Sequence, residues 1–170
     1  FDKDQVLLIQ GTGTLDKQIK TFKNELLDLS TVKSVTISDY LPIKGTKRNG
    51  NGFYKEGRSK TDQSVGGQMW RVDYDYINTM GMKLVDGRNF SEDMRTDSAS
   101  IIINQAMAKQ LGLEDPVGQR IMNWQVYNVI GVVEDFHFES VREQIRPLAM
   151  ILGEDSNIIS VKINSANMSS

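Results

Sequence analysis

Three observations predict an α+β fold for this chain. Strand, helix and strand patterns follow one another over residues 1–40, and residues 44–67 then change to a composition rich in Gly, Asn and Ser. The remainder is mostly strand-like, with short helical patterns between the strands. With 170 residues and a mass of 19.2 kDa, the chain is long enough to bury a substantial core as one domain or two small lobes.

The first part of the chain predicts a β-α-β unit. Residues 5–10 form a compact apolar run that favours a buried strand, and residues 32–38 resume strand chemistry before a turn at Pro42. Between them, apolar residues recur at three- and four-residue spacing, which is typical of an amphipathic helix. They are Leu15, Ile19, Phe22, Leu26 and Leu29, and Thr14 is a suitable N-cap.

Residues 44–67 mark the best internal boundary and predict a long excursion or a mobile hairpin. The segment carries Lys44, Lys47, Arg48, Lys55, Arg58 and Lys60, with Phe53 and Tyr54 between the two basic groups. Such a loop can grip single-stranded nucleic acid, touch a partner or remain solvated. Because the whole chain has a net charge of -2, we expect no nucleic-acid binding. We favour a solvated loop or partner contact at Phe53, Tyr54, Lys55 and Arg58.

Shorter elements are predicted after this boundary. Strand patterns occupy residues 68–74, 83–87, 100–104, 125–136, 147–152 and 158–163, and helical patterns occupy residues 75–81 and 105–112. Gly81 and Gly112 end the two helices, and Asp86 and Gly87 begin a turn. We expect Trp70 and Trp124 to be packing residues, with Trp124 at a surface corner because Asn123 and Gln125 flank it.

The only histidine, His137, lies in a cluster of ionisable residues with Asp135 and Glu139. In an extended strand these three side chains would share one face, and such a row could hold a metal or serve an enzyme. The alternative is a strand terminus at which Phe136 and Phe138 pack inward and His137 lies in a polar corner. We favour this second interpretation and expect neither a metal site nor a catalytic residue here, since no serine lies in a G-x-S-x-G motif.

Other features of the sequence exclude several kinds of site. The absence of cysteine removes disulfides and thiolate chemistry. Residues 11–14 (GTGT) lack both the third glycine of a dinucleotide-binding turn and the Gly-Lys-Ser/Thr of a P-loop, so we expect no cofactor. The apolar runs fall far short of the roughly 20 residues that span a bilayer. Since the chain begins FDKDQ without Met, we interpret it as a trimmed or processed segment that does not itself span the membrane.

Four ordered segments, residues 73–91, 101–112, 115–121 and 127–148, resemble the extracytoplasmic core domain of MacB/FtsX-type ABC transporter permeases. One family pattern, Y-x-x-x-M-G followed by G-R-x-F, is matched by Tyr76, Met80, Gly81, Met82, Leu84, Gly87, Arg88 and Phe90. A second pattern, V-I-G-V-V-x-D-F-(H/x)-F, includes Gly131, Asp135, Phe136, His137 and Phe138, while Pro116, Gly118 and Pro147 belong to neighbouring segments. We interpret these residues as a structural signature of the family.

The resemblance implies a domain on the outer face of the cytoplasmic membrane, in a loop between the first two membrane helices of a transport or efflux permease. The family brings no catalytic residues, and ATP hydrolysis belongs to a separate nucleotide-binding domain or subunit. The implied partners are the rest of the permease, its ATPase, and an envelope partner protein or transported substrate. The alternative is a stand-alone extracytoplasmic ligand-binding or sensor domain, which the excursion around Phe53 and Tyr54 favours.

The resemblance also implies a two-lobed α+β organisation. Residues 1–43 would begin a membrane-proximal β-α-β lobe, and residues 44–130 would form an inserted, mostly β lobe with short helices. Residues 131–170 would return to the first lobe. Because family domains continue beyond a strand such as residues 158–163, we expect the first lobe to be truncated at its C-terminal end.

Overall fold

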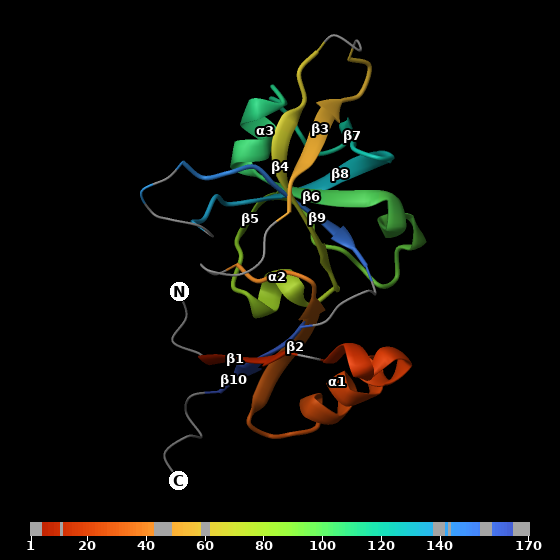
Figure 1. Ribbon diagram of the computed structural model, residues 1–170, viewed down its shortest axis with the longest axis vertical. Coiled ribbons are helices and arrows are strands. Elements are labelled where there is room, and N and C mark those ends of the chain that lie inside the picture. The colour runs from red at the N-terminus through yellow and green to blue at the C-terminus, as the bar shows by residue number, and fades with distance from the viewer. Residues whose placement is uncertain are drawn as a thin grey trace. The chain divides into compact units, whose positions relative to one another are not determined.

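The computed structural model has a mixed α+β fold, as predicted (Figure 1). It describes residues 5–10, 12–42, 49–58, 62–137, 142, 144–153 and 158–164, and these contain three α-helices and ten β-strands. The chain divides into two compact units. Unit 1 comprises Phe1–Asp39, Arg71–Met82 and Gly153–Ser170, and unit 2 comprises Tyr40–Trp70 and Lys83–Leu152.

Unit 1 contains the predicted strand, helix and strand at the start of the chain. These are β1 (Gln5–Gln10), α1 (Ile19–Leu27) and β2 (Val32–Ser38). β10 (Ile158–Ile163) lies between β1 and β2 and pairs antiparallel with both, so the first and last strands of the described chain build one sheet. The C-terminal strand therefore completes a sheet that the N-terminal segment begins.

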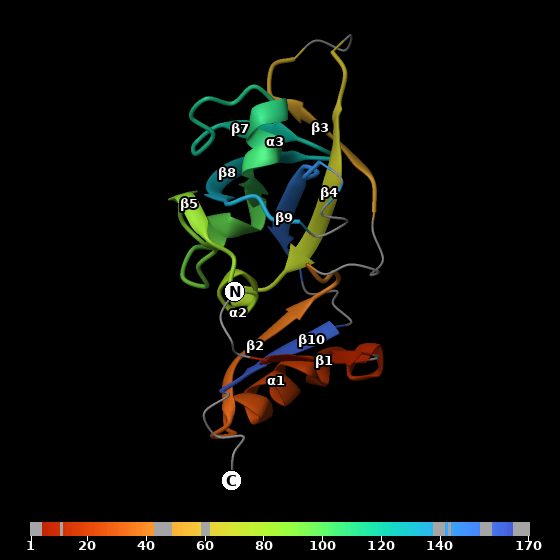
Figure 2. The same cartoon turned by 90° about the vertical axis from the view of Figure 1, so that its left-hand side faces the viewer.

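Helix α1 lies along the sheet of unit 1, as Figure 2 shows. The side chains of Ile19, Phe22 and Leu26 pack against a core of Val35, Ile37, Ile159 and Val161. The helix begins later than the sequence predicted. Residues 12–14 and 16–18 form 3₁₀ turns, closed by bonds such as Leu15 N to Thr12 O at 2.9 Å. Thr14 therefore does not cap the helix, and the predicted start was wrong.

Strand β1 is less buried than its apolar sequence suggested. It lies at the edge of the sheet, and Val6, Leu7 and Leu8 are 37%, 51% and 39% exposed. The prediction of a buried strand was wrong, because composition gives the apolar character of a strand but not its position in a sheet.

Residues 71–82 return to unit 1 and are held there by a carboxylate. Asp73 accepts hydrogen bonds from the Ile37 backbone N–H at 3.0 Å and from the Thr36 hydroxyl, and it pairs with the Lys23 Nζ at 2.9 Å. Burial acts to lower the pKa of Lys23, but hydrogen bonds to Asp75 and Asp73 outweigh it and raise the pKa. This segment includes α2 (Tyr76–Thr79), which packs beside β2.

Unit 2 is built on a closed ring of strands. In ring order they are β4 (Val65–Val72, of which residues 65–70 belong to this unit), β3 (Asn51–Lys55), β7 (Arg120–Met122), β8 (Val126–Val133), β6 (Ser100–Asn104) and β9 (Leu148–Leu152). β9 also pairs with β4, which closes the ring, and β6 runs parallel to β8. A further strand, β5 (Leu84–Gly87), pairs with β8. Closure leaves these six strands without a free hydrogen-bonding edge over their paired residues.

The core of unit 2 is filled from the strands and from α3 (Gln105–Gln110). Phe53, Ile101, Ile103, Met107 and Ile121 are fully buried there. Helix α3 ends at Gln110, and Gly112 follows its C-cap Leu111. Gly112 N–H bonds to Lys109 O at 3.1 Å and Leu113 N–H bonds to Ala108 O at 2.9 Å. Gly112 has a φ of 70°, so glycine is suited to this helix end, as the sequence predicted.

The two compact units differ from the sequence-based domain ranges in three places. Residues 71–82 lie in unit 1, and unit 2 begins at Tyr40, before the predicted boundary at residue 43. Residues 131–152 also lie in unit 2, because β8 continues to Val133 and β9 pairs with β6. Whether the ranges 1–43, 44–130 and 131–170 correspond to domains stays a prediction. Lys44, Lys47, Arg48, Lys60, Phe138 and Glu139 lie outside the described residues.

Candidate functional site

Two glycines of the signature patterns meet between β5 and β8. Gly87 lies opposite Gly131 in the strand register, and Arg88 N–H bonds to Ile130 O at 2.9 Å. A Cβ on Gly87 would lie 2.1 Å from Ile130 O, and a Cβ on Gly131 would lie 2.5 Å from Arg88 O. Neither position has room for a side chain. The two signature segments are therefore joined by a close contact of their backbones, which we call the glycine contact.

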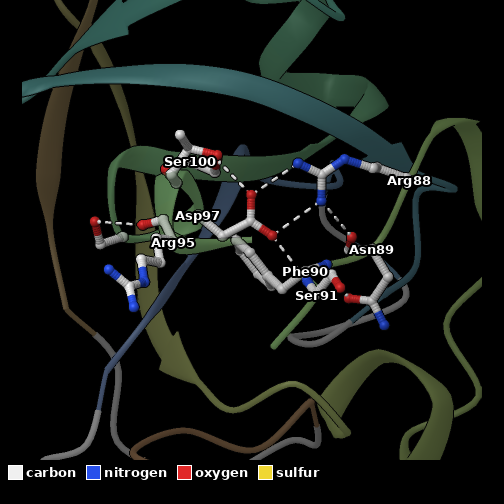
Figure 3. A network of polar contacts seen from close by, with 9 residues as sticks. Arg88, Asn89, Phe90, Ser91, Arg95, Asp97 and Ser100 are labelled. Atoms are coloured by element: carbon white, nitrogen blue, oxygen red, sulfur yellow. Dashed lines mark hydrogen bonds and ion pairs between the residues drawn. The ribbon is translucent and has the colours of Figure 1, made fainter. Parts of the chain in front are cut away.

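Beside the glycine contact, Arg88 and Asp97 form the centre of a polar network (Figure 3). The Arg88 guanidinium donates two hydrogen bonds to the Asp97 carboxylate, at 2.9 and 2.8 Å. The same carboxylate accepts from the Ser91 backbone N–H at 2.8 Å and from the Ser100 hydroxyl at 3.0 Å. We call this set of four residues the carboxylate network.

The carboxylate network is suited to holding structure. The Asp97 side chain is 0% exposed and both of its oxygens have donors, whereas Arg88 is 39% exposed. Hydrogen bonds from Arg88 hold the pKa of the Asp97 carboxyl below its ordinary value of 3.8, although burial opposes this. The carboxylate therefore stays ionised near neutral pH and ties the 91–100 segment to the end of β5.

Sequence reasoning identified Arg88 but missed Asp97. Asp97 lies in the polar stretch SEDMRTDSAS, where no periodicity distinguishes it from the other acidic residues. A usable signal is its place three residues before the buried strand β6, next to which an unpaired carboxylate would be costly.

The signature residues of unit 1 also serve the fold. Tyr76 is fully buried, and Gly81, with a φ of 67°, follows α2. Gly81 N–H bonds to Asn78 O at 3.2 Å and Met82 N–H bonds to Ile77 O at 3.0 Å, which is the bonding pattern of a glycine-ended helix. Met80 is the residue between helix and glycine and is half-buried.

The signature residues after α3 attach a turn to β8. Gly118 N–H bonds to Val129 O at 2.8 Å, and Gln119 N–H bonds to Pro116 O at 3.1 Å. Pro147, just before β9, is buried, and its carbonyl oxygen accepts from Gln68 N–H at 2.9 Å. Phe90, a signature residue that precedes α3, is also buried, at 5% exposed. These contacts agree with a structural role, and the assignment of these residues as a family signature stays a prediction.

The ionisable cluster follows the end of a strand, because β8 ends at Val133. Asp135 accepts a hydrogen bond from the Ala106 backbone N–H at 2.8 Å, in the first turn of α3. Phe136 packs against Trp70 with ring centroids 6.4 Å apart, and His137 is exposed. Asp135 thus stabilises the start of a helix. With Phe138 and Glu139 outside the described residues, the complete arrangement of this cluster stays a prediction.

Asn104 is a buried polar residue that sequence reasoning missed. Its side chain is 0% exposed, and its oxygen accepts from Met107 N–H at 2.9 Å and from Leu148 N–H at 3.0 Å. Its amide nitrogen donates to Arg146 O at 2.9 Å. The sequence did contain a signal for Asn104, because Asn directly before a helical pattern is a preferred N-cap.

The four residues expected to contact a partner are not equivalent. Phe53 is 0% exposed in the core of unit 2, and strand alternation places Tyr54, which is 38% exposed, on the opposite face. Lys55 is exposed, and Arg58 pairs with Asp62 at 3.6 Å. A partner could therefore reach Tyr54, Lys55 and Arg58 but not the buried Phe53, and contact at this segment stays a prediction.

Unit 2 also carries a shallow hollow of about 500 Å³ beside α3. Ala108, Leu113 and Val132 supply apolar surface, and Asp86, Lys109 and Glu114 supply charged groups. The volume is suitable for a small ligand or a peptide side chain.

Four exposed apolar side chains gather on the outer surface of β3, β7 and β8. Tyr54 lies opposite Met122, and Met122 lies opposite Val126, each 37–38% exposed. Trp124, in the turn between β7 and β8, is 94% exposed. We call these four residues the exposed row. The expectation that Trp124 is a packing residue was wrong, although it does lie at the surface, whereas Trp70 is fully buried.

The described ranges contain neither a metal-binding cluster nor a membrane-spanning helix. No group of three or more His, Asp or Glu side chains there is placed to hold a metal ion. None of the helices in the described part of the chain is long and apolar enough to cross a membrane.

Two solved structures with a similar fold are the periplasmic region of MacB and the extracellular domain of YknZ. The periplasmic region of MacB from Actinobacillus actinomycetemcomitans is similar with a TM-score of 0.60 and 18% identity, over 96% of this chain and 76% of that one. The extracellular domain of the noncanonic ABC-type transporter YknZ from Gram-positive bacteria is similar with a TM-score of 0.61 and 17% identity, over 96% and 84%. No curated protein sequence is detectably similar to this chain.

The fold is therefore that of an extracytoplasmic domain of ABC-type transporters. The profile of the MacB-like periplasmic core domain matches residues 2–166, and the chain belongs to this family. The resemblance seen in the signature segments is confirmed. Members of the family are periplasmic or extracellular domains of transporter permeases and not catalytic domains.

Proposed function

We propose that this domain engages a transported substrate or an envelope partner, and that its arrangement is coupled to ATP-driven movement of the membrane helices of its permease. The observation that carries the proposal is the family match over residues 2–166. ATP hydrolysis would take place on a separate nucleotide-binding domain or subunit. The domain would be exposed on the outer side of the cytoplasmic membrane.

The two compact units support such coupling. The chain passes between them four times, after residues 39, 70, 82 and 152, while unit 2 is braced internally by its strand ring and the carboxylate network. A bound partner can bias the movement only if it binds the two states of the transporter with unequal affinity. Because unit 2 is braced internally, it could present the same contact surface in both states of the transporter while its position relative to the membrane helices changes.

Distance measurements on the full-length transporter with its ATPase test this proposal. Because this chain has no cysteine, spin labels can be placed on Asn24→Cys in α1 and Lys109→Cys in α3 within an otherwise cysteine-free transporter. We expect the distance distribution between these labels to differ between the nucleotide-free and ATP-bound states.

A label pair within unit 2 provides the control. Met94→Cys and Lys109→Cys both lie in unit 2, so their distance distribution should be the same in both nucleotide states. Identical distributions for the Asn24 and Lys109 pair with and without ATP would contradict the coupling.

A second candidate is a stand-alone ligand-binding or sensor domain, and the hollow beside α3 is the observation that favours it. A ligand screen on the full-length protein separates the two candidates. Tight binding that is unaffected by ATP turnover and is lost when Lys109→Trp, at an exposed residue of the lining, fills the hollow would favour the sensor. Binding that changes with ATP turnover would favour the transporter domain.

A further inference from the structure

We propose that the exposed row, Tyr54, Met122, Trp124 and Val126, docks into a neutral apolar groove of a partner protein. The inference rests on the proposed function, which requires a contact surface but does not name one.

Trp124 has no packing role that would explain its presence. It is 94% exposed, whereas the other tryptophan, Trp70, is 0% exposed and stacks on Tyr40 with ring centroids 6.3 Å apart. An indole in water contributes nothing to the core, and its apolar surface becomes favourable only when something covers it. Tryptophan is also the residue type most often found at the energetic centre of protein interfaces.

The other three side chains extend this surface without interruption. Tyr54, Met122 and Val126 are direct neighbours across β3, β7 and β8, with Cα partners Tyr54↔Met122 and Met122↔Val126. Their chain neighbours Phe53, Ile121 and Tyr127 are 0%, 0% and 7% exposed and point into the core. The fold therefore fixes these three residues on the outer face, and the turn that bears Trp124 joins Met122 to Val126.

Recognition at this surface must come from side chains. β7 pairs with β3 on one side and with β8 on the other, so its paired residues offer no free edge to which a partner strand could add. A groove that takes the indole would need apolar walls and a hydrogen-bond acceptor for the indole N–H.

The charges around the row favour a neutral partner over a lipid surface. Asn123 and Gln125 flank Trp124, and Arg120 is paired with Glu56 at 2.6 Å. Lys55 lies opposite the buried Ile121 in the register and is out of line with the row. Anionic lipid headgroups and nucleic acid attract clusters of unpaired basic side chains, and the residues that the structure describes around the row do not supply one.

Photo-cross-linking in intact cells tests the inference on the full-length transporter. A benzophenone amino acid replaces Trp124, and in a matched control it replaces Met94, which is 45% exposed elsewhere on unit 2. We expect one discrete cross-link to a protein from position 124 and none from position 94. The captured protein should co-purify with the unmodified transporter, and Trp124→Ser should reduce that co-purification at least about tenfold.

Two further variants separate contact from folding. With the benzophenone at position 124, the triple change Tyr54→Ser, Met122→Ser and Val126→Ser should reduce the cross-link yield about tenfold. The apolar triple change Tyr54→Phe, Met122→Leu and Val126→Ile should leave the yield within about twofold, because the surface stays apolar. Equal yields from the two triple variants would overturn the inference.

Other outcomes would also overturn it. These are cross-links to lipid alone, cross-links only to a second copy of this chain, equal yields at positions 94 and 124, and no cross-link at all. The spin-label measurement uses none of the four residues in the row. An ATP-dependent distance change without a cross-link would leave the proposed function standing and reject the docking surface, and the reverse result would reject the coupling alone.

Discussion

Two regions of unit 2 make opposite use of their side chains. At the glycine contact and the carboxylate network, polar groups are paired, Asp97 is 0% exposed and the backbones of β5 and β8 touch. In the exposed row, Trp124 is 94% exposed and its neighbours turn apolar surface to the solvent. The first region contains three of the residues by which the family resemblance is seen, Gly87, Arg88 and Gly131, and the second contains none of them.

The difference shows that motif residues and contact residues need not coincide. The glycine contact and the carboxylate network pair the hydrogen-bonding groups of Gly87, Arg88 and Gly131 inside unit 2. Few of these groups therefore remain available to a partner. The four side chains of the exposed row are held in place by strand register, and most of their apolar surface makes no contribution to the core. A motif can thus report the fold while saying little about the binding surface.

The largest effect is expected at the glycine contact. Gly87→Ala should destabilise unit 2 by about 4 kcal/mol or prevent folding, because its Cβ would lie 2.1 Å from Ile130 O and φ is 69°. Gly57→Ala is the matched control, since its φ is 81° and nothing lies within 4 Å. That variant should lose only about 1 kcal/mol in urea unfolding. Similar losses for the two variants would show that the glycine contact is not close.

A smaller loss is expected at the carboxylate network. Asp97→Asn removes the buried charge that pairs with Arg88 and should lower the free energy of unfolding by about 3 kcal/mol. Glu56→Gln removes the exposed pair with Arg120, whose side chains are 37% and 53% exposed, and should cost less than about 1 kcal/mol. A loss at Asp97 as small as that at Glu56 would contradict the bracing role.

The same carboxylate predicts a dependence of stability on pH. The pKa of Asp97 is lowered in the folded state, so its contribution is complete above the ordinary carboxyl pKa of 3.8 and is lost as the pH falls through the lower folded pKa. Urea unfolding between pH 6 and pH 3 should therefore show a steeper loss of stability in the wild type than in Asp97→Asn. Parallel pH profiles would argue against a depressed pKa.

A still smaller effect is expected at the start of α3. Asp135→Ala removes the acceptor for the Ala106 N–H and should lower the free energy of unfolding by about 1 kcal/mol. Thermal unfolding with His137→Ala as the control checks this, because the exposed His137 should change the stability by less than about 0.5 kcal/mol. Equal losses at both positions would contradict a capping role for Asp135.

Local patterns predicted many elements of the fold. The β-branched runs at residues 100–104 and 158–163 are strands, and Gly81 and Gly112 end their helices. Burial was harder to predict, because the apolar strand β1 lies at a sheet edge and tryptophan is apolar whether it packs or not. Register and edge position depend on distant partners, which a local pattern does not contain.

The site was less predictable than the elements. The sequence identified Gly87 and Gly131 separately, but their contact depends on the register of two strands some forty residues apart. Asp97 was missed because its partner Arg88 is nine residues away across a turn and follows no helix or strand spacing. A site that forms only when distant segments of the chain meet cannot be predicted without the three-dimensional structure.

The most direct test of the contrast is the free energy of unfolding of Trp124→Ser and of Asp97→Asn, measured in urea under identical conditions. We predict a change within about 0.5 kcal/mol for Trp124→Ser, since the indole packs against nothing, and a loss of about 3 kcal/mol for Asp97→Asn. Equal losses for the two variants, or a larger loss for Trp124→Ser, would contradict the division between residues that brace unit 2 and residues available for contact.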